Sequence, residues 1–126
     1  MTYSLRVCKR VFLKKPSLLR VVIRPRAVID LEQVIDYYHQ FATADIAERF
    51  IAEFRAARDL LAERPNIGSR RFAHLLKGGA LRVWWLDRFP FRVFYIVEDE
   101  ILQIIGVDHE RRSVTKKSVL WRIGIR

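Results

Sequence analysis

Residues 81–112 show the clearest pattern of apolar and polar positions in the chain. Three apolar runs, rich in Val, Ile, Phe, Tyr and Trp, are separated by turn residues at 88–90 and 98–100. Runs of this length and composition are typical of β-strands. The pattern predicts a three-stranded antiparallel meander over about 81–88, 91–97 and 101–108.

The middle run is apolar at both residue parities, which predicts a strand covered on both faces. One face would carry Phe91, Val93, Tyr95 and Val97, and the other Phe94 and Ile96. Arg92 interrupts the second set. A charge in so apolar a strand is paired, at the strand end, or functional. His109 ends the next run, so we expect it near Arg92 on one sheet.

Upstream, the apolar period changes from strand to helix. Leu31, Val34, Ile35 and Tyr38 form a stripe that Val28 and Phe41 extend, with Asp30, Glu32, Gln33 and Asp36 on the other side. This predicts an amphipathic helix over 27–41. A second helix is predicted over 44–64, with Thr43 as its N-cap and Pro65 as its stop. The short connection makes the two an α-helical hairpin, which should pack on the sheet.

A short β-branched run at 20–24 precedes the hairpin and predicts an edge or partner strand. The fold class is therefore α+β: an N-terminal strand, an α-helical hairpin, then a three-stranded antiparallel meander, with the helices packed on one face of the sheet. We expect three segments, namely a basic extension at 1–19, one folded domain at 20–113, and a basic and apolar tail at 114–126. The tail could add a strand, dock on the core, or become ordered with a partner. For the extension, a flexible arm, an upstream addition and a nucleic-acid-binding arm stay open.

Charge divides the chain. The net charge is +10, yet residues 30–63 hold eight acidic residues and three arginines, whereas residues 64–92 hold seven basic residues and one acid. A basic surface of this kind suits nucleic acid or an acidic protein. Arg70, Arg71 and Lys77 interleave with Phe72 in the loop before the meander, and Arg111 and Arg112 follow it.

Composition excludes several classes. The single Cys8 rules out an intrachain disulfide and a cysteine metal cluster. No apolar run approaches the roughly 20 residues of a membrane span, and none near the start resembles a signal peptide. We therefore expect a cytoplasmic protein that uses no metal or other cofactor.

The order of these segments resembles the RelE/ParE superfamily of bacterial toxin–antitoxin toxins. The resemblance rests on VVIRPRAVIDLEQVIDYY, on the Pro-x-x-Gly turn in ERPNIGSR, on LRVWWLDRFPFRVFYIV with its Arg-x-x-Tyr, and on the His-x-x-Arg end in IIGVDHERRS. It covers about residues 20–113. Residues 1–19 are additional to the usual family start, Ser113 stands where an Asp is often found, and the tail has no family counterpart that we can assign.

The resemblance implies one of two toxin activities. RelE-like members cleave messenger RNA on the ribosome without a metal, and Arg82, Arg92 and His109 would be the catalytic candidates, with Lys77 and Tyr95 behind them. Arg92 would hold the scissile phosphate, and His109 would act as acid or base. ParE-like members instead bind and poison DNA gyrase and catalyse nothing themselves. The motifs are closer to ParE-like members, and Lys77 is the one lysine between residues 21 and 109.

On the ParE-like interpretation, Arg92 and His109 have structural or binding roles. The predicted partner-binding residues are Arg70, Arg71, Lys77, Trp84, Arg111 and Arg112. The resemblance implies a cognate antitoxin as partner and DNA gyrase, or the ribosome with its mRNA, as target. It also leaves room for a homodimer or a toxin–antitoxin hetero-oligomer. A non-toxic nucleic-acid-binding or structural relic of the fold is the alternative from another class.

Overall fold

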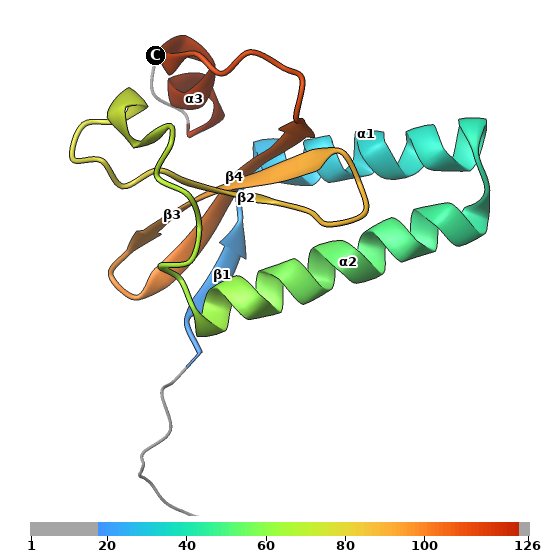
Figure 1. The fold of residues 1–126 in the computed structure, drawn as a ribbon, viewed down its shortest axis with the longest axis horizontal. Helices are drawn as coiled ribbons and strands as arrows, with labels where there is room; N and C mark the ends of the chain where they lie inside the picture. Colours follow the sequence, from blue (N-terminus) through green and yellow to red (C-terminus); the bar gives the residue numbers. More distant parts are fainter. Residues whose placement is uncertain (1–17, 124–126) are drawn as a thin grey trace, which may run out of the picture.

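A computed structural model describes residues 18–123, and it is an α+β fold in which a four-stranded sheet lies between a helical hairpin and a short C-terminal helix (Figure 1). Residues 1–17 and 124–126, and with them most of the predicted basic extension, lie outside the described residues. The elements in chain order are β1 (Arg20–Ile23), α1 (Pro25–Phe41), α2 (Ala44–Glu63), the 3₁₀ turn η1 (Ala73–Leu75), β2 (Arg82–Trp85), β3 (Phe91–Glu98), β4 (Ile101–His109) and α3 (Lys116–Arg122).

The sheet confirms the predicted meander and places the N-terminal strand beside it. The strand order is β1-β4-β3-β2, with β1 parallel to β4 and the other neighbours antiparallel. Asp99 and Glu100 both have positive φ, as the two-residue turn between β3 and β4 requires. Strand β2 is shorter than predicted because residues 86–90 leave the sheet toward α2, where the Arg88 N–H donates to Glu53 at 3.0 Å.

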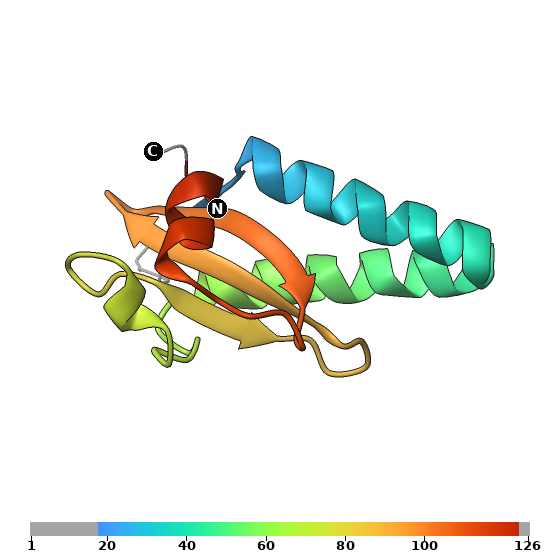
Figure 2. The same ribbon diagram turned by 90° about the horizontal axis from the view of Figure 1, so that it is seen from above.

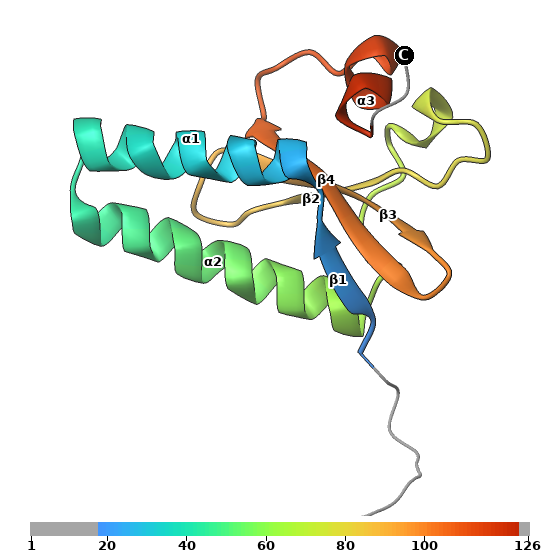
Figure 3. The same cartoon turned by 180° about the vertical axis from the view of Figure 1, so that it is seen from behind.

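Both long helices form where the apolar pattern predicts them. Helix α1 begins two residues earlier than expected, at Pro25, because proline suits the first helical position. The Thr43 side chain caps α2 by accepting from the Ile46 N–H at 3.1 Å. The two helices run side by side on one face of the sheet (Figure 3).

Three positions of α1 differ from the prediction. Val28 and Phe41 are 40% and 67% exposed, so they extend the stripe onto the surface and not into the core. Asp30, predicted on the polar side, is buried. Helix α1 reaches past the sheet at its C-terminal end (Figure 3), where Phe41 is exposed. Asp30 instead accepts a hydrogen bond from the Val107 N–H of β4.

The core is divided between the two faces of the sheet. Phe50, Phe54, Tyr95 and Leu102 are among the buried residues between the sheet and the helical hairpin. Leu81, Val83, Phe94, Ile105 and Val119 form a second, smaller cluster on the opposite face. Strand β3 contributes to both clusters, which confirms the prediction of a strand covered on both faces.

The C-terminal tail docks on the core as helix α3, one of the three outcomes that the sequence left open. The helix covers the sheet face opposite the hairpin and contributes Val119 to the second cluster (Figure 2). It is fastened to the start of α1, because Arg122 pairs with Asp30 and Arg24 donates to the Ile123 carbonyl at 3.0 Å. No helix within residues 18–123 is long and apolar enough to cross a membrane.

A β-bulge in β4 decides which side chains share a face. From Glu98 to Tyr95 the register with β4 is regular, and it shifts by one residue between Tyr95 and Phe94. Ile105 and Gly106 then lie on the same face, and Arg92 pairs with Asp108. A shift of one residue exchanges the faces of every position beyond it. His109 therefore pairs with Phe91 on the hairpin side, while Arg92 faces α3.

Candidate functional site

Arg92 is a buried cation with two fixed partners. Its Nε donates to Asp108 at 2.8 Å, and its Nη2 donates to the Arg112 carbonyl at 2.5 Å. The side chains of Arg92 and Asp108 are only 5% and 9% exposed. The rings of Phe72 and Phe94 lie 5.6 Å and 5.2 Å from the guanidinium carbon. Of the roles open to a charge in this strand, the structure therefore gives Arg92 a pairing role.

Arg82 and Tyr95 act on the opposite face, where they fasten the Pro-x-x-Gly turn. Arg82 donates from Nη1 to the Asn66 and Gly68 carbonyls at 3.0 and 2.9 Å. The Tyr95 hydroxyl donates to the Pro65 carbonyl at 2.7 Å and accepts from the Gly68 N–H at 3.0 Å. A Cβ on Gly68 would lie 2.2 Å from that hydroxyl, so the turn requires glycine. Burial raises the pKa of Tyr95.

His109 also lies on the hairpin face, at the other end of the sheet. Its ring packs edge-on against Phe91, with centroids 5.5 Å apart, and its Nδ1 accepts from the Arg111 N–H at 3.1 Å. The three predicted catalytic side chains are thus not brought together. Arg92 and His109 are on opposite faces, and Arg82 shares the face of His109 but pairs with Tyr95, several positions away along the strand.

The arginines after the meander do converge with one from the preceding loop. Arg71, Arg111 and Arg112, all exposed, meet at a pocket of about 400 Å³ on the α3 side of the sheet. We call this the arginine pocket. Its other lining residues are Phe72, Trp85, Arg92, Glu110 and Val114.

The remaining predicted partner-binding residues lie elsewhere. Arg70 is exposed and donates to the Gly79 carbonyl at 2.8 Å, which closes the loop that carries exposed Lys77. Trp84 is half-buried and packs against the hairpin core. Its neighbour Trp85 faces the other way and lines the arginine pocket.

Sequence reasoning missed the pairing of Asp108 with Arg92 and the contribution of Trp85 to the pocket. A regular hairpin register would have placed Val107 opposite Arg92, and the bulge replaces it with Asp108. Gly106 was the available signal, because a glycine inside a strand often marks a bulge. A Cβ on Gly106 would lie 2.6 Å from Nη1 of Arg122, so this glycine also lets α3 approach the sheet.

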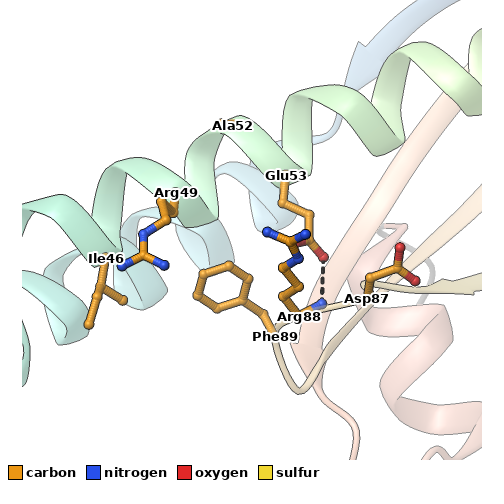
Figure 4. Close-up of a pocket in the computed structure, with 7 residues that line it drawn as sticks. All are labelled: Ile46, Arg49, Ala52, Glu53, Asp87, Arg88 and Phe89. Carbon is orange, nitrogen blue, oxygen red and sulfur yellow. Dashed lines mark hydrogen bonds between the residues drawn. The ribbon is translucent and has the colours of Figure 1, made fainter.

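Two other cavities lie on the hairpin side, and their linings contain acidic as well as basic side chains in more equal numbers than the arginine pocket does. The first, between α2 and residues 87–89, is lined by Arg49 and Arg88 and by Glu53 and Asp87, with the Phe89 ring pointing into it (Figure 4). The second has about 580 Å³ and includes Asp30, Tyr37, Asp108 and His109 in its lining. No group of three or more His, Cys, Asp or Glu residues suited to a metal ion occurs within residues 18–123.

The arginine pocket can bind an anion, but its lining offers little for acid–base chemistry. Arginine stays protonated at any working pH and donates hydrogen bonds without accepting them. Glu110 is the one carboxylate in the lining, and it is exposed at the rim. The pocket therefore has the chemistry of a recognition surface.

Comparison with known proteins identifies the family. The model of the family "ParE toxin of type II toxin-antitoxin system, parDE" matches residues 21–114, from β1 to the start of the C-terminal tail. A solved structure of the chromosomal ParDE TA system from P. aeruginosa superposes with a TM-score of 0.61 at 21% identity, and it covers 73% of this chain and 96% of that chain. Among curated proteins, none matches. With the family match extending over most of its length, this chain belongs to the ParE toxins of type II toxin–antitoxin systems.

Proposed function

We propose that this toxin inhibits DNA gyrase and is neutralised by a cognate antitoxin. The observation that carries the proposal is the separation of Arg82, Arg92 and His109, each of which has a structural contact of its own. Ribosome-dependent RNA cleavage needs a phosphate-binding group and an acid or base around one bond. A gyrase poison needs only a binding surface, and the ParE family match favours this activity over cleavage.

A poison of this kind acts by holding its target in one state. No bond is made or broken by the toxin, so its residues supply shape and charge. The α3 side of the sheet offers both, because the arginine pocket and the basic loop around Lys77 border the same face. The acidic helical hairpin lies on the other side of the sheet, which gives the molecule one basic and one acidic side.

The antitoxin follows from the class of system to which the family belongs. An acidic or amphipathic segment that becomes ordered on binding would complement the basic surface of the toxin. Such a partner would compete with gyrase wherever the two contacts overlap. We expect the purified antitoxin to suppress every effect of the toxin when added in excess.

The direct test uses purified gyrase and supercoiled plasmid DNA. The toxin should lower the supercoiling rate and increase the amount of plasmid linearised when gyrase is denatured during the reaction. Arg55→Ala, a change on the exposed hairpin side, should leave both effects intact. Unchanged supercoiling with folded toxin in excess would contradict the proposal.

A second assay mixes the same purified toxin with ribosomes that carry a messenger RNA and looks for cleavage of that RNA. Cleavage of the message by the wild type, lost in His109→Ala with the fold intact, would replace gyrase inhibition by the RelE-like activity. We expect no cleavage from either protein.

A further inference from the structure

The floor of the arginine pocket is a buried guanidinium held in one orientation. Asp108 occupies Nε of Arg92 and the Arg112 carbonyl occupies Nη2, and within residues 18–123 no hydrogen bond engages Nη1. A donor fixed in this way loses little entropy when an acceptor arrives. The floor therefore presents a preorganised N–H donor to whatever enters the pocket.

The rim adds positive charge that the floor lacks. Asp108 neutralises Arg92, so the field of the pocket comes from Arg71, Arg111 and Arg112, against which only Glu110 stands. These three side chains are exposed and free to adjust to a ligand. The half-buried rings of Phe72 and Trp85 form apolar walls. Because apolar walls lower the local dielectric constant, charge-assisted hydrogen bonds formed beside them are stronger than in water. A ligand that matches this pocket would therefore be an anion.

The extent of the basic surface favours a polyanion over a single carboxylate. Arg70 and Lys77 are exposed on the loop that supplies Arg71 to the pocket, and Lys116 and Lys117 are exposed on α3, which follows the lining residue Val114. One carboxylate would neutralise only one of these cations. A nucleic-acid backbone repeats a phosphate along its length, and guanidinium groups bind phosphate oxygens in pairs.

From this geometry we propose that the arginine pocket binds a phosphate group of the DNA backbone, with Arg92 at its floor and Arg71, Arg111 and Arg112 around it. The choice of DNA over RNA rests on the proposed function, because gyrase works on bound duplex DNA. The toxin would then contact the DNA of the gyrase complex as well as the enzyme.

The test is the affinity of the full chain for a labelled duplex of mixed sequence, measured by fluorescence anisotropy over a series of salt concentrations. The logarithm of the association constant falls with the logarithm of salt by about 0.9 per phosphate neutralised. We expect Arg71→Ala/Arg111→Ala/Arg112→Ala to reduce this slope by roughly 2–3 and to weaken binding at least about tenfold at low salt.

A charge-matched control separates the pocket from the net charge. Arg49→Ala/Arg55→Ala/Arg58→Ala removes three positive charges from α2, where two of these arginines form surface ion pairs. It should change the slope by less than one. Residues 1–17, which are basic, are present in every variant and cancel in the comparison. Arg92→Lys, checked for folding by circular dichroism, should weaken binding while keeping the charge, because an ammonium lacks the planar fork.

Three results would overturn the proposal. One is an equal loss of binding in the two triple variants. Another is that polyglutamate displaces the labelled duplex as effectively as unlabelled DNA does at the same concentration of negative charge. That result would assign the pocket to an acidic protein. The third is tighter binding of single-stranded RNA that depends on the same three arginines.

Failure of this proposal is distinguishable from failure of the proposed function, because DNA affinity is measured without gyrase. If gyrase is inhibited while the two triple variants bind DNA alike, the pocket assignment falls and the gyrase activity stands. If the three pocket arginines are needed for DNA binding but gyrase is unaffected, the pocket assignment stands and the proposal of gyrase inhibition falls.

Discussion

At the scale of single residues, buried polar side chains connect the turns and the neighbouring elements of this fold. Tyr95 fastens the turn after α2, Arg92 fastens the turn after β4, and Asp30 joins α1 to both β4 and α3. Each is buried, and a buried polar group that loses its partner costs more than the net gain from forming the bond. Replacement of these residues should therefore affect stability before it affects any activity.

Tyr95→Phe tests the first of these connections. The change removes two hydrogen bonds and leaves the Pro65 carbonyl and the Gly68 N–H without their partner. We expect the free energy of unfolding in urea to fall by about 1–3 kcal/mol. Tyr37→Phe, at a tyrosine that is 56% exposed, should change it by less than about 0.5 kcal/mol. Equal effects of the two changes would contradict the role given to Tyr95.

The same tyrosine should make stability depend on alkaline pH. Burial raises the pKa of Tyr95 above its ordinary value of 10.0, so the folded state retains the phenolic proton to higher pH than the unfolded state. The contribution is fully present below pH 10 and is lost as pH rises from 10 through the folded-state pKa. Urea unfolding at a series of alkaline pH values should show this fall, and Tyr95→Phe should show a smaller one. A steeper fall in the variant would contradict the sign.

The Arg92–Asp108 pair should behave as a buried ion pair. Arg92→Ala or Asp108→Ala alone leaves an uncompensated charge and should cost about 3–5 kcal/mol, whereas the double variant should cost much less than the sum. Unfolding in urea measures the cycle. Additive losses would show that the two side chains act independently.

At the scale of elements, α3 and the bulge in β4 depend on each other. Strand β1 pairs with β4 only from Ile101 to Ile104, which leaves the outer edge of β4 open farther along. Asp30 accepts from the Val107 N–H on that edge at 3.0 Å, and Arg122 passes Gly106 to reach the same carboxylate. The glycine, the acid and the arginine thus form one junction between three elements.

A mutant cycle at this junction tests how α3 is held. Arg122→Ala leaves Asp30 buried without its cation, at a cost of roughly 3 kcal/mol. Gly106→Ala places a Cβ 2.6 Å from Nη1 of Arg122 and should displace the same side chain. The double variant should therefore lose much less than the sum of the two. Lys117→Ala, on the exposed side of α3, serves as the control for unfolding in urea, and strictly additive losses would argue against a shared contact.

The elements could be predicted from the sequence where one periodicity governs them. The stripe from Leu31 to Tyr38 and the apolar runs of β3 and β4 identified the hairpin and the meander. The limits of β2 could not be predicted, because they depend on a hydrogen bond to Glu53, a residue far away in sequence. Helix α3 is too short and too mixed in pattern to be assigned before its docking face is known.

At the scale of the whole molecule, the sheet separates an acidic side from a basic side. The hairpin carries the acidic excess of residues 30–63, whereas the loop at 64–81, Arg111 with Arg112, and α3 carry clusters of basic residues. This division was visible in the sequence. The composition of the arginine pocket was visible only in part, because Arg71, Arg111 and Arg112 were candidates, whereas Trp85 and the orientation of Arg92 depend on the register of β4.

The sheet faces on which Arg92 and His109 lie also bear on which of the two toxin activities the fold can support. A sheet without the bulge would place His109 on the face of Arg92, where an acid or base beside a phosphate-binding group would support RNA cleavage. The observed register separates them. This separation is the physical reason for favouring inhibition of gyrase.

Pulse labelling after induced expression, in cells without the antitoxin, tests this account most directly. Thymidine and methionine incorporation are followed together from the moment of induction. Inhibition of gyrase predicts an early fall in thymidine incorporation while methionine incorporation continues. An immediate fall in methionine incorporation, with thymidine incorporation persisting, would contradict the account and return Arg82, Arg92 and His109 to the centre of the mechanism.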